Sequence, residues 1–139
     1  MRAFRGIIER HFPDFPAAGG LPIRLRFAPF CMPGATRADL DDLVDRQRSA
    51  GARWRVEGVK FMIDGTVDGG TAWLEHADAN GESTAPFWPD PAEYVWAAGY
   101  LADRGVPIVT HAIGDAGVRY VLDALSGTRR GRVPHRVEH

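Results

Sequence analysis

The chain has 139 residues, 45% of them hydrophobic, which is enough to bury one core, so we expect a single domain over residues 1–139. Its 17 basic and 18 acidic residues leave a net charge of -1, which argues against a nucleic-acid or anionic-membrane partner. One cysteine excludes an internal disulfide and a cysteine-based zinc cluster, and no long apolar run or charged leader occurs, so a soluble cytoplasmic protein is expected.

The first part of the chain predicts two helices separated by a strand. Residues 1–11 alternate cationic and apolar side chains, as at the end of a helix. Residues 23–30 alternate apolar and polar side chains, which predicts a strand. Thr36 and Asp39 then have the spacing of a helix capping box, and Gly51 is expected to stop that helix.

A second strand is predicted over residues 58–65, which are apolar in the middle and polar at the carboxyl end. Its Lys60, Met62 and Asp64 share one face, because side chains alternate along a strand. A loop rich in glycine and proline follows, over residues 65–91. A loop of this length is either a functional lid or a sign that an element has been missed.

The last part of the chain predicts a helix, a strand, a helix and a short strand, over residues 91–104, 107–113, 116–125 and 133–139. Asp90 is placed to cap the first of these helices, which starts with proline. Asp115 is placed to cap the second. His111 lies at the carboxyl end of the strand between them.

Alternation of strands and helices predicts an α/β fold with a parallel sheet. Two architectures are compatible with this order, an open doubly wound sheet and part of a (β/α)8 barrel. A doubly wound sheet would normally carry a glycine-rich phosphate turn after its first strand. Residues 30–34 do not form such a turn, which favours the barrel.

Lysine occurs once, at Lys60, whereas sixteen of the seventeen basic residues are arginine. A buried lysine amine can act as a base, form a Schiff base or take up carbon dioxide as a carbamate, none of which a guanidinium does. A biased base composition of the coding sequence would explain the single lysine equally well.

Three side chains that could bind or bridge a metal lie on three different predicted strands, toward the carboxyl end of each: Lys60, His111 and His139. Carboxyl ends of parallel strands meet at one edge, so these side chains are expected to converge on a divalent metal, with zinc, iron and nickel all suited to imidazole. Each has a simpler explanation. The histidines could be hydrogen-bonded structural residues, and Lys60 could pair with Asp64 or Glu138.

Four segments resemble the metal-dependent amidohydrolases of the family 3 type, which include N-substituted formamide deformylases: residues 58–66, Thr71-Ala72, 111–115 and 135–139. The family fold is a (β/α)8 barrel with a small β-sandwich. The resemblance begins near residue 21 and implies a partial TIM barrel, roughly the third to sixth strands with their helices.

The resemblance implies that His111 and His139 are metal ligands at the ends of the fifth and sixth strands. It implies that Lys60, on the fourth strand, is the lysine that can be carboxylated to bridge two metals. One or two divalent metals are expected, zinc first, and the implied reaction is hydrolysis of an amide or related C-N bond in a small molecule.

Three further residues are candidate substrate contacts: Asp64, Asp115 and Trp73. Asp115 is first of all a candidate helix cap, and an aromatic residue in a long loop serves packing at least as often as binding. His76 and His135 are interpreted as surface or loop residues outside the site.

The family carries a His-x-His pair on its first strand and an aspartate after its eighth, and neither is in this sequence. We therefore expect the middle of a longer enzyme, with weak metal binding and no useful turnover by itself. Exposed edges of a partial parallel sheet predict self-association into homo-oligomers. The alternative function is a small α/β module that binds an anion at the helix start over residues 114–117.

Overall fold

The structure is a computed structural model that describes residues 23–128 and 134–139. These residues form, in order, β1 (Leu25–Phe27), α2 (Arg37–Arg46), β2 (Trp54–Val56), β3 (Val59–Met62), α3 (Pro91–Asp103), β4 (Ile108–His111), α4 (Asp115–Ser126) and β5 (Arg136–Glu138). The helix expected over residues 1–11 lies outside the described residues. Within them, no helix is long and apolar enough to cross a membrane.

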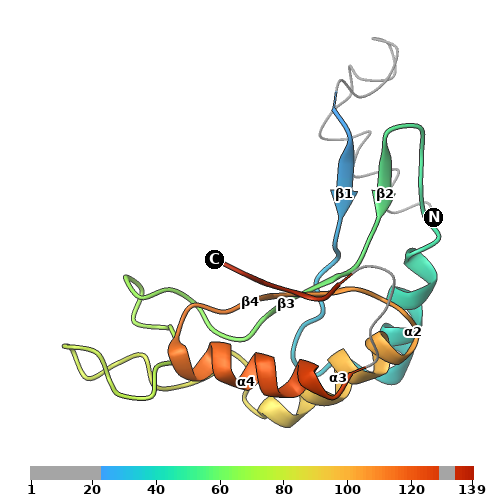
Figure 1. Cartoon of the computed structure of the whole chain (residues 1–139). Coiled ribbons are helices and arrows are strands. Elements are labelled where there is room, and N and C mark those ends of the chain that lie inside the picture. The colour runs from blue at the N-terminus through green and yellow to red at the C-terminus, as the bar shows by residue number, and fades with distance from the viewer. Residues whose placement is uncertain (1–22, 129–133) are drawn as a thin grey trace.

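The strands form two small parallel sheets, ordered β1-β2 and β3-β4-β5. In Figure 1 the β1-β2 pair projects from the body, and α3 and α4 lie on one side of the larger sheet. The fold is therefore mixed α/β with parallel pairing, as the alternation of elements predicts.

The two sheets are continuous through bent chain segments. After β1, Lys60 N donates to Pro29 O at 2.8 Å and Cys31 N donates to Lys60 O at 2.9 Å, so this segment runs beside β3. Gly58 separates β2 from β3 and has a φ of +91°, a left-handed conformation that glycine adopts without strain. The bend at Gly58 thus turns one extended segment into two strands.

Strand β2 was not predicted, because no element was assigned between Gly51 and the strand expected over residues 58–65. The strand has only three residues, Trp54 to Val56, which is too short for a pattern of alternating apolar and polar side chains to be recognised. The strand is held by its neighbour, since Trp54 packs edge-on against Phe27 with ring centroids 6.2 Å apart. Tertiary contact, more than local sequence, makes this segment a strand.

Helix α2 begins as the sequence predicts. Thr36 is the N-cap, Asp39 N donates to its hydroxyl at 3.3 Å, and Thr36 N donates to the Asp39 carboxylate at 2.8 Å. This reciprocal pair is the capping box. Helix α3 likewise begins at Pro91 with Asp90 as its cap.

The end of α2 differs from the prediction. The helix ends at Arg46 with Gln47 as its C-cap, several residues before Gly51. The Gln47 side chain accepts from Gly58 N at 2.7 Å and donates to Leu43 O and Gly58 O. A tertiary contact to the bend therefore sets the helix end.

The core lies between the larger sheet and the helices. Phe61 packs edge-on against Tyr94, with ring centroids 5.2 Å apart, and against Trp88 at 6.0 Å. Thr110 shares a hydrogen bond with the Tyr94 hydroxyl at 3.0 Å. Burial raises the pKa of Tyr94 to about 12, so the phenol stays protonated in this interior.

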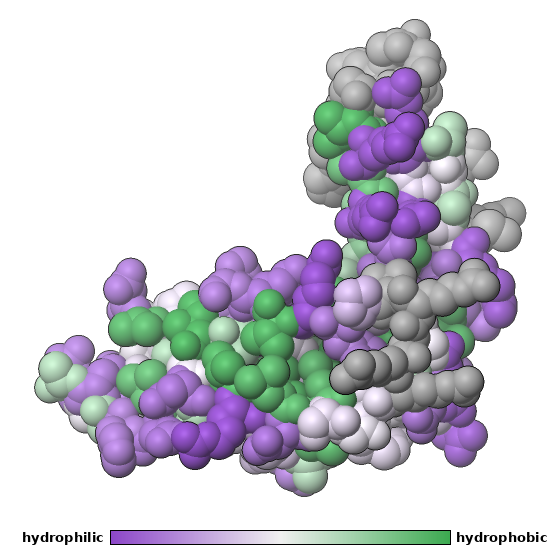
Figure 2. Space-filling model, viewed as in Figure 1, coloured by the Kyte–Doolittle hydropathy of each residue, from purple (hydrophilic) through white to green (hydrophobic). Residues whose placement is uncertain are grey.

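Apolar side chains also gather on the surface over α4 and β5 (Figure 2). Leu122, Leu125 and Val137 line a groove there of about 530 Å³, and Leu122 is 56% exposed. His135 lies in the same groove, half-buried in the loop segment before β5, as expected for a loop residue. Its Nδ1 accepts from Ile108 N at 3.0 Å, so it ties the segment before β5 to β4.

We predict opposite effects for two glycine substitutions. Gly58→Ala is expected to lower the free energy of unfolding by about 2 kcal/mol or more, because alanine disfavours a positive φ and its Cβ would lie 2.8 Å from Pro107 O. Gly99→Ala, in α3 with open space around the added Cβ, is expected to raise it by about 0.5 to 1 kcal/mol. Urea denaturation measures both, and equal effects would contradict the role of the bend.

Candidate metal centre

The site is built on the face of the larger sheet opposite the core. Met62 pairs with His111 and His111 pairs with Glu138 across the parallel strands. Paired residues in a sheet point to the same side, and Lys60 is two residues before Met62. Because Val59 and Phe61 point into the core, the alternate residues share the other face.

Two histidines meet at the carboxyl end of this face. The rings of His111 and His139 are 5.0 Å apart between centroids, at an interplanar angle of 54°. His111 Nε2 lies 2.7 Å from Gly65 O. A carbonyl oxygen only accepts, so Nε2 carries the hydrogen and Nδ1 keeps the lone pair that a metal would use.

Lys60 is engaged in an ion pair within the sheet. Its Nζ lies 2.6 Å from Glu138 Oε2, and the two side chains are 16% and 33% exposed. The hydrogen bond from Lys60 is the largest cause of a lowered pKa of Glu138. Of the two carboxylates considered as partners for Lys60, the structure selects Glu138.

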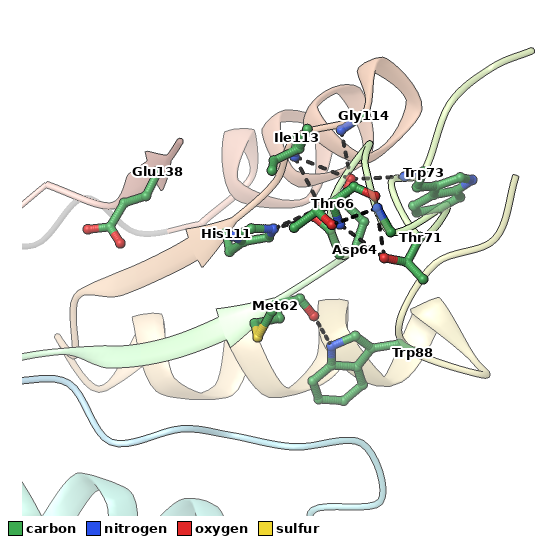
Figure 3. A network of polar contacts seen from close by, with 12 residues as sticks. Met62, Asp64, Thr66, Thr71, Trp73, Trp88, His111, Ile113, Gly114 and Glu138 are labelled. Carbon is green, nitrogen blue, oxygen red and sulfur yellow. Dashed lines mark hydrogen bonds and ion pairs between the residues drawn. The ribbon is translucent and has the colours of Figure 1, made fainter. Parts of the chain in front are cut away.

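Asp64 has no exposed surface and binds backbone amides from two separate segments (Figure 3). Its carboxylate accepts from Trp73 N at 3.0 Å, Ile113 N at 3.1 Å and Gly114 N at 2.7 Å. His111 Nε2 is 3.6 Å from the same carboxylate. The geometry gives Asp64 a positioning role, and its expected contact with a substrate stays a prediction.

Three of the four backbone amides over residues 114–117, at the start of α4, are hydrogen-bonded within the chain. Gly114 N donates to Asp64, Ala116 N donates to Asp115, and Gly117 N donates to Trp73 O at 3.0 Å. The negative groups that suit a helix N-terminus are thus supplied by the chain itself. These contacts disfavour an anion site at the start of α4, and the alternative of an anion-binding module stays a prediction.

Asp115 is not the cap of α4. Gly114 is the N-cap, and Asp115 is the first helical residue. The Asp115 carboxylate accepts from Glu75 N and from Ala116 N, each at 2.9 Å. The hydrogen bond from Glu75 N is the largest cause of its lowered pKa. Asp115 stays exposed, and its substrate contact stays a prediction.

Trp73 packs against the body of the molecule. Its ring lies 5.2 Å from that of Tyr120, between centroids, and it borders the hydrophobic core. It is half-buried. Packing explains this residue without a ligand, and its proposed contact with substrate also stays a prediction.

The long loop between β3 and α3 forms turns and bends over residues 65–90, as predicted. A cavity of about 690 Å³ opens between it and the end of β3, next to the carbonyl that holds His111. The sequence did not indicate which loop residues would line this cavity, because the loop has no period.

The donor set fits a divalent metal only in part. Two imidazoles lie together, and nitrogen donors suit zinc. Among residues 23–128 and 134–139, no group of three or more His, Cys, Asp or Glu side chains is placed to hold a metal. The metal-ligand roles of His111, His139 and Lys60 stay predictions.

No family model and no curated protein matches the chain. Solved structures that it resembles include an uncharacterized metal-dependent hydrolase from Pyrococcus horikoshii OT3, with 25% identity and a TM-score of 0.69 over 100% of this chain and 26% of that one. Another, from Pyrococcus furiosus, has 24% identity and a TM-score of 0.66 over 95% and 27%. The chain spans about a quarter of the length of each.

We predict that Asp64→Asn lowers the free energy of unfolding by about 3 kcal/mol, because the amide would point an N–H donor at backbone N–H groups that now donate to the buried carboxylate. Asp68→Asn, an exposed residue of the adjoining loop, should change it by less than about 0.5 kcal/mol. Urea denaturation tests both variants, and a neutral Asp64→Asn would contradict the positioning role.

We also predict that Lys60→Met raises the pKa of Glu138 toward its ordinary 4.5, with Arg136 at 3.3 Å keeping part of the lowering. A lowered pKa means that the pair stabilises the fold above pH 4.5 and that this contribution is lost as the pH falls through the folded-state pKa. Carbon-13 NMR of the Glu138 carboxyl measures the change. Arg48→Met, which breaks the distant pair with Asp45, should leave that pKa unchanged, and an unchanged value in Lys60→Met would refute the pairing.

Proposed function

We propose that this chain is part of a metal-dependent hydrolase that cleaves an amide or related C-N bond of a small molecule, with His111 and His139 as metal ligands. The observation that carries the proposal is the pair of imidazoles 5.0 Å apart at the carboxyl ends of two adjacent parallel strands. The likeness to a protein named a metal-dependent hydrolase supports the reaction class. The resemblance to family 3 amidohydrolases supports the bond type.

We further propose that the strands are a consecutive part of a (β/α)8 barrel. The segment after β1, then β3, β4 and β5, lie side by side in chain order with parallel pairing. Helices α3 and α4 lie on the outer face (Figure 1). In such barrels the active site is at the carboxyl ends of the strands, which is where the two histidines are.

When bound, a divalent metal, zinc as the first candidate, supplies a Lewis acid for the scissile carbonyl and lowers the pKa of an attacking water. His111 would hold it through Nδ1, since Nε2 is engaged with Gly65 O. That carbonyl fixes the ring orientation and raises the basicity of the ligand nitrogen. Asp64 holds the surrounding turn in place without leaving the interior.

Carboxylation of Lys60 requires a neutral amine, which adds carbon dioxide to form a carbamate and releases one proton. The ion pair with Glu138 holds the ammonium form instead. We propose that the two states compete, with carboxylation following release of Lys60 from Glu138.

The test is titration of the chain with Co²⁺, followed by visible absorption and by NMR of the histidine rings. His111→Ala and His139→Ala should each weaken binding more than about tenfold, and His76→Ala should not. Binding should also weaken as the pH is lowered, because imidazole ligands must be deprotonated. Metal binding that survives both ligand substitutions would overturn the proposal.

A further inference from the structure

The cavity beside the end of β3 has a composition that indicates what it binds. It is lined by the end of β3 and by parts of the loop that follows, namely Met62, Asp64, Gly65, Gly70, Thr71 and residues 82–87. Phe87 is 42% exposed there. The cavity therefore combines apolar surface with a few polar groups, as small-molecule sites do.

The charges in the cavity wall are negative. Two of its lining residues, Asp64 and Glu82, are acidic, and none is arginine, lysine or histidine. Asp64 is fully buried and satisfied by backbone amides. Glu82 is exposed, and its carboxylate has no hydrogen-bond or ion-pair partner among the described residues.

Glu82 is held at the cavity by its backbone. The Glu82 backbone amide donates to Asp78 Oδ1 at 2.9 Å. The next residue, Ser83, has a φ of +66°, and its hydroxyl donates to Asp78 Oδ2. The Glu82 carboxylate lies against Gly70, in the space that a Cβ would fill. Because Gly70 has no side chain, the Glu82 carboxylate can lie against the cavity wall.

We propose that this cavity binds an ammonium group attached to an apolar body, such as an arylalkylammonium, with Glu82 as its counter-ion. The apolar body would contact Met62 and Phe87. This inference rests on the proposed function, because it names the substrates that the hydrolase would select. The link is Gly65, which lines the cavity and whose carbonyl accepts from His111, so the cavity opens beside a candidate metal ligand. It would then select amide substrates that carry a cationic substituent.

Binding to the chain itself can be tested without metal. Nitrogen-15-labelled protein in EDTA is titrated at pH 7 with benzylamine, which is a cation there, with benzyl alcohol and with benzoate, and amide shifts are followed by NMR. Benzylamine should bind about fivefold more tightly than benzyl alcohol, the size expected for one exposed charge pair, and benzoate should bind more weakly than either. Shifts should map to residues 65–71 and 82–87.

Glu82→Gln is expected to bring benzylamine and benzyl alcohol within about twofold of each other, and Asp68→Asn, an acid of the same loop outside the cavity wall, should leave the preference unchanged. Equal or tighter benzoate binding, shifts centred on the α4-β5 groove, no binding by any probe, or an equal loss in Asp68→Asn would overturn the inference. Because no metal is present, failure here is distinct from failure of the Co²⁺ titration.

Discussion

The buried carboxylate of Asp64 is the interaction on which the rest of the site depends. Burying a charge is costly unless it is hydrogen-bonded, and here amides from the long loop and from the β4-α4 turn meet that requirement. The positive end of α4 adds to the stabilisation. The end of β3, the loop and the segment that carries His111 are thereby fixed to one another before any ligand is involved (Figure 3).

The parts of the fold that the sequence predicts are those with a local physical cause. The capping box at Thr36, the Asp90-Pro91 start and the apolar segments of β3 and β4 each follow from neighbouring residues. Strand β2 and the end of α2 depend on contacts between distant segments, which periodicity does not record. The start of α4 was predicted one residue too late, because Gly114 is the N-cap and Asp115 is the first residue of the helix.

At the site, strand direction alone was enough to expect His111 and His139 together, because parallel strands end at one edge. The same reasoning could not choose between Asp64, Glu138 and a metal as the partner of Lys60, because alternation gives the face on which a side chain lies but not the atom that it reaches. It also proposed Asp64 as a substrate contact, but it did not predict that the Asp64 carboxylate accepts from the backbone amides of the turn at Gly114. Side chains alternate between the two faces only within a strand, and β3 ends at Met62. The alternation therefore does not predict where the Asp64 side chain points.

The ion pair of Lys60 with Glu138 joins β3 to β5 across β4, and it uses the only lysine of the chain. Apart from the α-amino group, amine-directed reagents and ε-ammonium resonances therefore report on one atom, Lys60 Nζ. Acylation at that atom reports the release of Lys60 from Glu138 without any introduced label.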